Sequence, residues 1–474
     1  MSYTKHIVII GGGFCGTMTA VNLIRDAKSP LKITIINAGA PFILGVAFKS
    51  YSSKHLLNVA ANNMSAYPED PMHFTKWVKA REEYKEFETD LLAKTFLPRN
   101  LFGEYLQHIW DTTLGTKRND VDVEILEEYV TNLEFMQNNS VKVILQNGGS
   151  VIANYIVLAT GNSLPRNPQI TNQDYFSSVT YFRNPWHPAS VSTLNQTGDV
   201  LIIGNGLTMV DTVMGLIEKG FKNKIHSISA NGFGVLPHRH FGIQYTGLVK
   251  ELQTRFELYK LVGIVNKHIK KVRKLGVSAG PVIDSLRPYS QRIWESLSLD
   301  EKKKFLSRLR HLWGVARHRL PVFIFDIIQK LRIEGQLVVH EGTIINITET
   351  DQLANVTFFN SKKKHEETLT VQRVINCTGP ESSIYKTLNP LLRKLAEKKI
   401  ISSDPLELGI NIDVKTYNII NAEGEKINSV YTLGNNLKGQ LWETVAVPEL
   451  RLQAQQLSKI LLEVCAETKL KVPS

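Results

Sequence analysis

The chain has 474 residues, which is more than one ordinary core accommodates and predicts two or three domains. Its hydrophobic content of 43% and charged content of 21% are typical of a soluble globular protein, and no stretch is apolar for long enough to cross a bilayer. The net charge of +12 indicates a solvated basic surface with affinity for small anions. Nucleic-acid binding is not expected, because no known aromatic-interleaved basic motif is present.

The three cysteines, Cys15, Cys377 and Cys465, lie far apart in the sequence. Their odd number and the absence of a C-x-x-C pair exclude a redox-active disulfide of the usual type and favour a reducing compartment. The first predicted strand begins a few residues after Met1, which leaves no room for a signal peptide. We therefore expect a cytoplasmic protein with no stable membrane insertion and no metal site.

The first predicted element is a buried strand over residues 6–10, a run rich in β-branched residues and bounded by glycine. Gly11, Gly13 and Gly16 follow in G-x-G-x-x-G spacing, and an amphipathic helix is predicted after them. A second β-branched run over residues 32–36 closes a βαβ unit of the length that a dinucleotide-binding fold needs.

These glycines have separate predicted roles. Gly11 lets the chain turn sharply off the strand, Gly13 lets a pyrophosphate approach the backbone, and Gly16 lets the helix pack close to the sheet. The phosphates would then face the free N–H groups of the helix N-terminus. The alternative is a glycine turn with no ligand.

Asn37 replaces the acidic residue expected after the second strand, and its amide can bond a ribose only without charge assistance.

Residues 41–78 are rich in Asn, Ser, Pro and Gly and lack clean periodicity, which is typical of a long functional segment. Residues 73–80 nevertheless look helical, and another helix is predicted to begin after Pro98. Arg99 and Tyr105 lie near its start, where a cofactor could meet them. The alternative for these two residues is surface charge and core packing.

Short alternating runs over residues 121–156 are separated by turn residues and predict a β-meander. The last run ends in Thr160 and Gly161. A strand that stops in A-T-G after such a meander is the usual return into a flavin-binding sheet.

The same pattern recurs after residue 198. A buried strand over residues 199–203 is followed by Gly204 and Gly206 in the first two glycine positions, with Met209 in the third. A further strand and a second meander follow, and the last strand ends in T-G at Gly379. The chain thus contains two dinucleotide units, as a hydride relay from a nicotinamide to a flavin requires.

A largely helical insertion is predicted at about residues 245–330. Its helices are basic and amphipathic. The simpler interpretation is that one face packs on the core while the lysines lie in water. The alternative is a role at a membrane surface or with an anionic partner.

The chain carries a set of longer motifs: IVIIGGGFCGTMTAVNL, HLLNVAANNMSAYPEDP, PRNLFGEYL, VLATGN, IIGNGLTMVD, SLRPYSQRIWESLSLDEKKKFL, RHRLP, VINCTGPES and GQLWETVAVPELR. Together they resemble the uncharacterised FAD/NAD(P)-binding proteins of the YdhS type, a family similar in layout to N-hydroxylating and class B flavin monooxygenases. The resemblance runs nearly end to end. It implies an α/β flavoprotein with two dinucleotide-binding domains, Rossmann-like three-layer units, β-meanders and a helical insertion.

The resemblance further implies FAD in the first unit and NAD(P)H in the second. It places His55 and Asn58 beside the flavin ring, and Trp442 and Glu443 ahead of a helix N-terminus at the pyrimidine edge, where a helix dipole favours the reduced anion. The alternative for His55 is a loop histidine bonded to backbone. We expect cofactor contacts from Gly11, Gly13, Phe14, Gly16, Asn37, Leu57, Met64, Arg99, Val130, Thr160, Gly161, Gly204, Gly206, Thr208, Asp211, Arg239, Gly379, Gly434, Asn435 and Thr444.

Two positions depart from the patterns of related flavoproteins. Asn435 stands where many have an aspartate on the ribityl chain, which weakens this expected contact. The segment YFRNPWHP has the aromatic and histidine character of the class B fingerprint but no central glycine.

The expected nicotinamide cofactor is NADPH, with NADH possible. The strand of the second unit ends in Ala230 and Asn231, so no acid repels a 2′-phosphate. Arg239 and its flanking histidines follow, and Lys222 and Lys224 precede the strand. The family usually has an arginine near this strand end, which this sequence lacks, so we expect a looser phosphate contact.

Three functions are compatible with this pattern. The first is an FAD-dependent NAD(P)H oxidoreductase that hydroxylates a small organic substrate through a flavin C4a-hydroperoxide. The second is a reductase or transhydrogenase without oxygen insertion, and the third is a flavin-binding protein without turnover. We expect residues 1–190 and 365–474 to form the FAD-binding domain and 191–364 the NAD(P)H-binding domain. The sequence leaves the oligomeric state open.

Overall fold

The structure is a computed structural model that describes residues 4–238, 244–252 and 256–467. The chain divides into two compact units. Unit 1 comprises the described residues up to Ser50, Val59–Ser163 and those from Ser382 onward, whereas unit 2 comprises Tyr51–Asn58 and Leu164–Glu381. These borders differ from the expected ones near residues 190 and 365. The reason is that residues 181–182 and 373–376, which lie outside the expected range 191–364, form strands in the sheet of unit 2.

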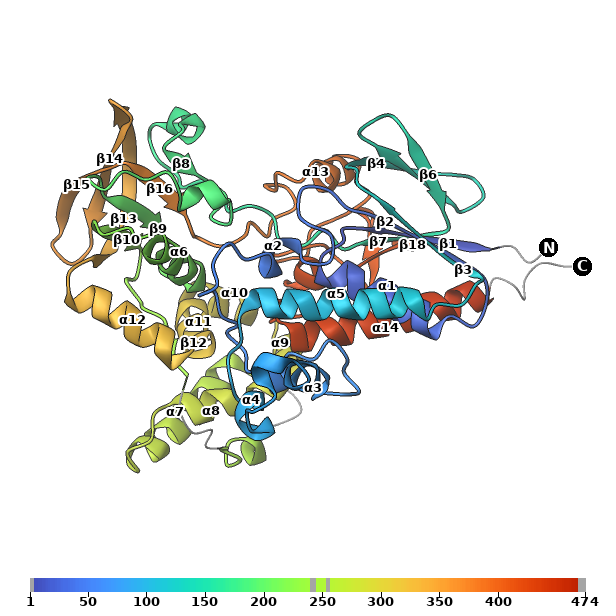
Figure 1. Cartoon of the computed structure of the whole chain (residues 1–474), viewed down its shortest axis with the longest axis horizontal. Coiled ribbons are helices and arrows are strands. Elements are labelled where there is room, and N and C mark those ends of the chain that lie inside the picture. Colours follow the sequence, from blue (N-terminus) through green and yellow to red (C-terminus); the bar gives the residue numbers. More distant parts are fainter. Residues whose placement is uncertain (1–3, 239–243, 253–255, 468–474) are drawn as a thin grey trace, which may run out of the picture. The chain divides into compact units, whose positions relative to one another are not determined.

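Unit 1 is built on a six-stranded sheet (Figure 1). Its strands, in spatial order, are β17 (Asn418–Ile420), β18 (Lys426–Thr432), β7 (Tyr155–Leu158), β1 (Lys5–Ile10), β2 (Leu31–Ile36) and β3 (Val121–Leu126). All neighbours pair in parallel except β17 and β18. Strand β1 lies in the middle, and Ile7, Val8 and Ile9 are fully buried, as a parallel strand covered on both faces requires.

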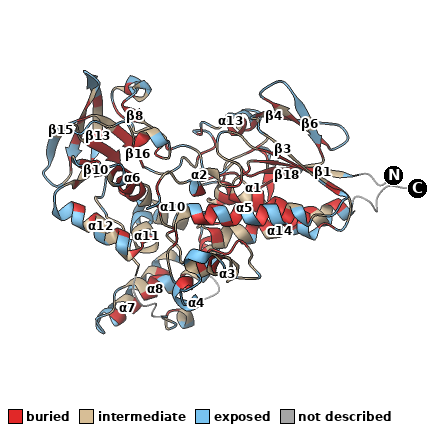
Figure 2. Cartoon of the chain, viewed as in Figure 1, coloured by how far each residue is buried: buried red, intermediate tan, exposed pale blue. Residues whose placement is uncertain are grey.

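The helices of unit 1 are α1 (Phe14–Asp26), α2 (Gly45–Phe48), α3 (His73–Lys79), α4 (Thr89–Ala93), α5 (Arg99–Gly115), α13 (Pro390–Glu397) and α14 (Val447–Glu467). Helix α1 packs against β1 and β2 of this sheet, and α5 and α14 pack against α1. Figure 1 shows α1, α5 and α14 side by side, and Figure 2 shows buried residues along the faces of α1 and α14. Helix α5 begins after Pro98, as predicted, and Tyr105 is buried within it. Burial raises the pKa of the Tyr105 phenol.

The expected meander over residues 121–156 is only partly correct. Strands β4 (Val130–Phe135), β5 (Val141–Leu145) and β6 (Ser150–Ala153) form an antiparallel sheet of their own. Strand β3 instead joins the main sheet, because it pairs in parallel with β2 from Leu31 and Val121 onward. Alternating apolar residues predicted a strand here but carried no information about its partner.

Unit 2 is built on a seven-stranded sheet. Its strands, in spatial order, are β15 (His365–Val371), β14 (Leu353–Asn360), β13 (Leu337–Thr350), β10 (Ile225–Ser229), β9 (Val200–Ile203), β16 (Arg373–Asn376) and β8 (Tyr181–Phe182). Strands β13, β10, β9, β16 and β8 pair in parallel, whereas β13 to β15 form the second meander. Because β8 and β16 pair here, both segments belong to unit 2.

The other elements of unit 2 are helical or short. The helices are α6 (Leu207–Glu218), α7 (Leu258–Arg273), α8 (Gly280–Ser285), α9 (Ser290–Ser296), α10 (Leu299–Arg308), α11 (Arg310–Arg317) and α12 (Val322–Ile333), and β11 (Leu236–Pro237) pairs with β12 (Arg319–Leu320). Helix α7 buries Leu261 and Val272 while Lys270 and Lys271 are exposed, as the simpler interpretation of the insertion predicts. Among the described helices, none combines the length and the apolar character that a membrane crossing needs.

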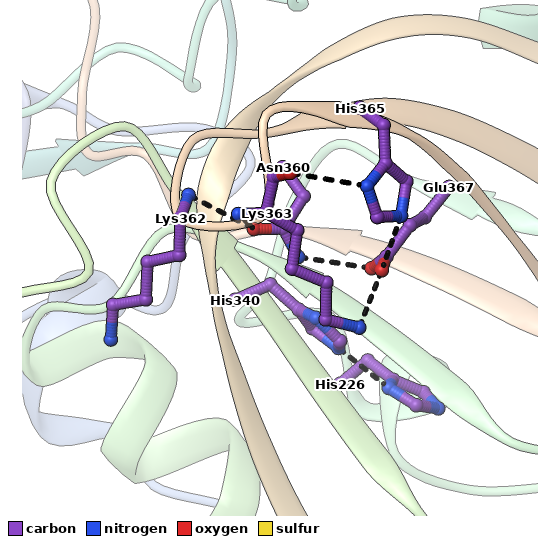
Figure 3. A network of polar contacts seen from close by, with 7 residues as sticks. All are labelled: His226, His340, Asn360, Lys362, Lys363, His365 and Glu367. Atoms are coloured by element: carbon purple, nitrogen blue, oxygen red, sulfur yellow. Dashed lines mark hydrogen bonds and ion pairs between the residues drawn. The ribbon is translucent and has the colours of Figure 1, made fainter.

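Two histidines share a hydrogen bond on the sheet of unit 2 (Figure 3). His226 Nδ1 on β10 lies 3.0 Å from His340 Nε2 on β13, so one nitrogen donates and the other accepts. His226 Nε2 lies 3.2 Å from Asp199 Oδ2. Burial, and then the neighbouring His226, lower the pKa of His340 to about 4. Glu367 on β15, held by Lys363 and Asn360, opposes this change only in part.

The His340 pKa predicts an acid-sensitive sheet. An unfolded histidine gains its proton near pH 6.5, before folded His340 does, so His340 destabilises the fold as pH falls from about 6.5 to about 4. The urea midpoint should therefore fall between pH 7.5 and pH 5, and less so in His340→Gln. Exposed His365 lies on the same meander, and His365→Gln should retain the full drop. An unchanged drop in His340→Gln would contradict the assignment.

Candidate cofactor-binding sites

The first glycine loop (residues 11–16) joins β1 to α1 and needs glycine at both ends. Gly11 has a φ of +108°, and a Cβ there would lie 2.2 Å from the carbonyl oxygen of Ala159, on the segment that follows β7. A Cβ on Gly16 would lie 1.9 Å from the carbonyl oxygen of Gly11. These two glycines are therefore required by close backbone packing, as their predicted roles demand.

Gly13 differs from its two neighbours in the loop. A Cβ on Gly13 would have only the Cα of Gly45 near it, at 3.9 Å. Gly13 is also the N-cap of the 13-residue helix α1, and no side chain caps that end. The first N–H groups of α1 thus adjoin backbone without a side chain, which is the arrangement that admits a pyrophosphate.

Asn37 follows β2 and its amide is bonded within the loop. Its Oδ1 accepts a hydrogen bond from Gly12 N at 2.9 Å, and its Nδ2 donates to Ala40 O at 2.8 Å. A carboxylate at this position could accept the first bond but could not donate the second. The structure thus gives Asn37 a role in fixing the loop, beside the ribose contact that we expect of it.

The second glycine loop (residues 204–209) repeats this geometry in unit 2. Gly204 has a φ of +106°, and a Cβ there would lie 2.6 Å from the carbonyl oxygen of Cys377, after β16. A Cβ on Gly206 would have nothing within 4 Å, and Gly206 is the N-cap of α6 without a side-chain cap. In both loops, therefore, the first glycine touches the return strand while the second adjoins open space.

The T-G residues after β7 and β16 adjoin these loops. Gly161 and Gly379 both have positive φ, at +68° and +92°, and a Cβ on either would have nothing within 4 Å. Thr160 Oγ1 accepts a hydrogen bond from Asn436 Nδ2 at 3.1 Å. The segment after β7 is thus held by Asn436, and both glycines leave space at the carboxyl edge of their sheet, where ligands of such sheets bind.

A buried glutamine fixes the turn after β18. Gln453 on α14 accepts a hydrogen bond from Gly434 N at 2.9 Å and donates to Thr444 Oγ1, which in turn donates to Gly434 O. Asn435 follows Gly434, and its Oδ1 is buried without a hydrogen-bond partner among the described residues. A buried acceptor without a partner is unfavourable unless a ligand or water satisfies it, so Asn435 fits a cofactor contact.

Trp442 and Glu443 lie between this turn and α14. Trp442 is buried, and Glu443 has a φ of +63°, a conformation uncommon for a residue with a side chain. Such backbone is often found at functional sites, and the role of Glu443 stays a prediction.

His55 belongs to unit 2 with Leu57 and Asn58. It is 1% exposed, and its Nε2 lies 2.8 Å from the carbonyl oxygen of Asp211 on α6. This is the backbone-bonded geometry of the alternative interpretation, although a catalytic role for His55 stays untested. Leu57 is buried, and the carbonyl of Asn58 lies 3.1 Å from Nε2 of His238.

The other expected cofactor contacts have the following places. Phe14, Met64 and Val130 are buried in unit 1, Arg99 is the first residue of α5, and Thr208 and Asp211 lie in the first turns of α6. Phe14 packs against the rings of Phe48 and Phe102. Arg239 lies outside the described residues. Among those described, no group of histidine, cysteine and carboxylate side chains could hold a metal ion.

Three features of the sites escaped sequence reasoning. Gln453 lies on a long helix with no motif around it, and Asn436 is one polar residue among many in its segment. Gly45 has a φ of +55° and approaches Gly13, where a Cβ on Gly45 would lie 3.4 Å from the Gly13 Cα. Of the three, only Gly45 could have been suspected from the sequence, because a glycine within an irregular segment often takes a positive φ.

Comparison with known proteins agrees with this geometry. Residues 8–163 match a family model described as FAD-NAD(P)-binding. The matched residues include the first glycine loop and lie in unit 1, apart from Tyr51–Asn58. No curated protein matches the chain at a significant level.

Several solved structures share the fold over almost their whole length. The ornithine N-hydroxylase of Kutzneria sp. 744 is 15% identical, with a TM-score of 0.65 over 98% of this chain and 100% of that one. The L-lysine 6-monooxygenase of Pseudomonas syringae is 17% identical, with a TM-score of 0.65 over 98% and 99%. The bacillithiol disulfide reductase of Staphylococcus aureus is 12% identical, with a TM-score of 0.56 over 97% and 99%. The chain therefore has the α/β fold of flavoproteins with two dinucleotide-binding domains.

Proposed function

We propose that the protein is an FAD-dependent NAD(P)H oxidoreductase that acts as a monooxygenase on a small organic substrate. The observation that carries this proposal is the repeated glycine geometry. Gly11 and Gly204 each touch a return strand, whereas Gly13 and Gly206 each adjoin space at the N-cap of a helix. Two such sites in one chain suit a nicotinamide that reduces a second, bound dinucleotide.

The residues of unit 1 fit FAD. Gly13 and the first N–H groups of α1 would hold its pyrophosphate, and the buried Oδ1 of Asn435 would accept from a ribityl hydroxyl. Gln453 and Thr444 fix the backbone on both sides of Gly434 and so orient this acceptor. Bound FAD would supply the chemistry of accepting two electrons from NAD(P)H and delivering them to a second acceptor.

Thiol chemistry is a weaker candidate for this chain. Burial raises the pKa of the Cys15 thiol to about 12, and burial likewise raises the pKa of Cys377 to about 12. A thiolate is the reactive form, so neither cysteine is prepared for nucleophilic attack at neutral pH. Cys465 is buried, and none of the three cysteines is in a disulfide bond. These observations favour monooxygenase chemistry over disulfide reduction through a cysteine pair of the protein.

The substrate class that we propose is a primary amine. The similar structures include hydroxylases or monooxygenases named for ornithine, lysine and cadaverine, so these three amines form a suitable first panel. We further propose that Trp442 and Glu443 contribute to the flavin site of unit 1, and that His55 and Asn58 position the nearby backbone of unit 2 through the contacts described above.

The two kinds of glycine should respond differently to substitution. In Gly13→Val the side chain enters open space, so the protein should fold but lose bound FAD, because the pyrophosphate cannot reach the backbone. In Gly16→Ala the Cβ meets a backbone carbonyl, which should destabilise unit 1 by about 3 kcal/mol. The measurements are flavin absorbance per protein and urea unfolding. A Gly13→Val protein with full flavin content would contradict the assignment.

Gly206→Val should separate nicotinamide binding from flavin binding. We expect flavin reduction by NADPH to slow by at least about tenfold, the effect of losing about 1.4 kcal/mol of binding. Reduction by dithionite should be unchanged, because it needs no nicotinamide site. An equal loss of both reductions would indicate misfolding and would leave unit 2 without support as the nicotinamide site.

Oxygen insertion should be visible in the products. With NADPH and isotopically labelled dioxygen, a hydroxylated amine should carry the label, and NADPH consumption should match product. Fast flavin reduction with hydrogen peroxide as the sole oxygen product for all three amines would favour a reductase. No reduction by either nicotinamide would favour a binding protein.

A further inference from the structure

The loop after β10 in unit 2, which would meet the adenosine ribose, carries no acidic residue. Strand β10 ends at Ser229, and Ala230 and Asn231 follow. Because β10 pairs in parallel with β9, the loop after β10 lies at the same carboxyl edge as Gly204. In dinucleotide units this position decides between a free ribose hydroxyl and a 2′-phosphate.

A guanidinium from a distant part of the sequence reaches this loop. Arg332, in the last turn of α12, places its Nη1 3.7 Å from the position that a Cβ on Gly234 would take. Its side chain is exposed, and it makes no hydrogen bond or ion pair with any described residue. By contrast, Lys330 on the same helix pairs with Glu334 at 3.8 Å.

The other charges near the loop are of both signs. Glu341 on β13 lies beside Gly232, where a Cβ would be 3.1 Å from the Glu341 Cβ, and its carboxylate would repel a phosphate. The turn after β14 lies beside Glu341, because Ser361 N donates to Glu341 O at 2.8 Å. This turn carries Lys362, whose side chain extends away from Glu367 in Figure 3, whereas Lys363 is paired with Glu367. Lys362 is exposed and adjoins Ser361, so the turn that contacts Glu341 also carries a positive charge.

We propose that Arg332 is the residue that binds the 2′-phosphate of NADPH and so sets the cofactor preference. The inference rests on the proposed function in taking unit 2 as the nicotinamide site. A guanidinium suits this task because it is always charged and its planar fork matches two phosphate oxygens. Lys222 and Lys224, considered from the sequence, lie at the opposite end of β10 and do not fit this role.

The test compares two nucleotide fragments by calorimetry on the flavin-loaded protein. Adenosine 2′,5′-bisphosphate carries the 2′-phosphate, and 5′-AMP does not. Arg332→Ala should weaken the first by roughly ten- to hundred-fold and leave the second unchanged, and Arg332→Lys should restore part of the loss. The matched control Lys330→Ala removes a charge from the same helix and should leave both affinities unchanged.

Several results would overturn the assignment. They are an unchanged bisphosphate affinity in Arg332→Ala, an equal loss for both fragments, or no binding of either fragment by the unmodified protein. A loss in Arg239→Ala with none in Arg332→Ala would move the contact to Arg239 and also overturn it. Arg332-dependent binding of the bisphosphate supports the assignment even where NADPH fails to reduce the flavin, which would count against the proposed function alone.

Discussion

The structure depends on one close contact made twice, between the first glycine of each loop and the carbonyl of a returning strand. The Ala159 and Cys377 carbonyls occupy the space that a Cβ on Gly11 or Gly204 would need. This contact brings strands far apart in the sequence, β1 and β7 or β9 and β16, to a common edge. In each unit, the helix after the glycine loop then begins at that edge, with its N–H groups and its dipole directed to it. Pyrophosphate binding at each loop would follow from this packing rather than from a charged side chain.

The glycines around this contact have two different roles. The glycines at the ends of the first loop are required by packing, whereas Gly13 and Gly206 adjoin space that the chain leaves free. In unit 1, side-chain amides rather than charged groups fix the neighbouring turns. Asn37 and Gln453 each bond the backbone of a turn, so these turns are held rigid without burying a charge. A preorganised backbone reduces the entropy that a flexible dinucleotide site would lose on binding.

Local patterns made the glycine loops, the strands before them and the helix after Pro98 predictable from the sequence. The partners of those elements were less accessible. Strand β3 has the alternation of a meander strand but pairs with β2, and segment 51–58 sits in the sequence of unit 1 but packs in unit 2. Gln453 bonds a turn, and Arg332 lies beside a loop, that is many residues away in the sequence, and no spacing rule connects them. Their positions follow from the tertiary fold, which one sequence does not display.

The interleaving of the two units has a consequence for how the chain is made. Strand β7 of unit 1 has β1 on one side and β18 on the other, and β18 is separated from β7 by all of the second sheet. During synthesis, one edge of β7 therefore remains unpaired until unit 2 has been synthesised and β18 follows it. An unpaired edge in a parallel sheet is exposed to wrong partners, and its late closure is a non-local event of the kind that slows folding. Gln453 lies farther along the chain than β18, so its bond to Gly434 can form only after β18 has been synthesised.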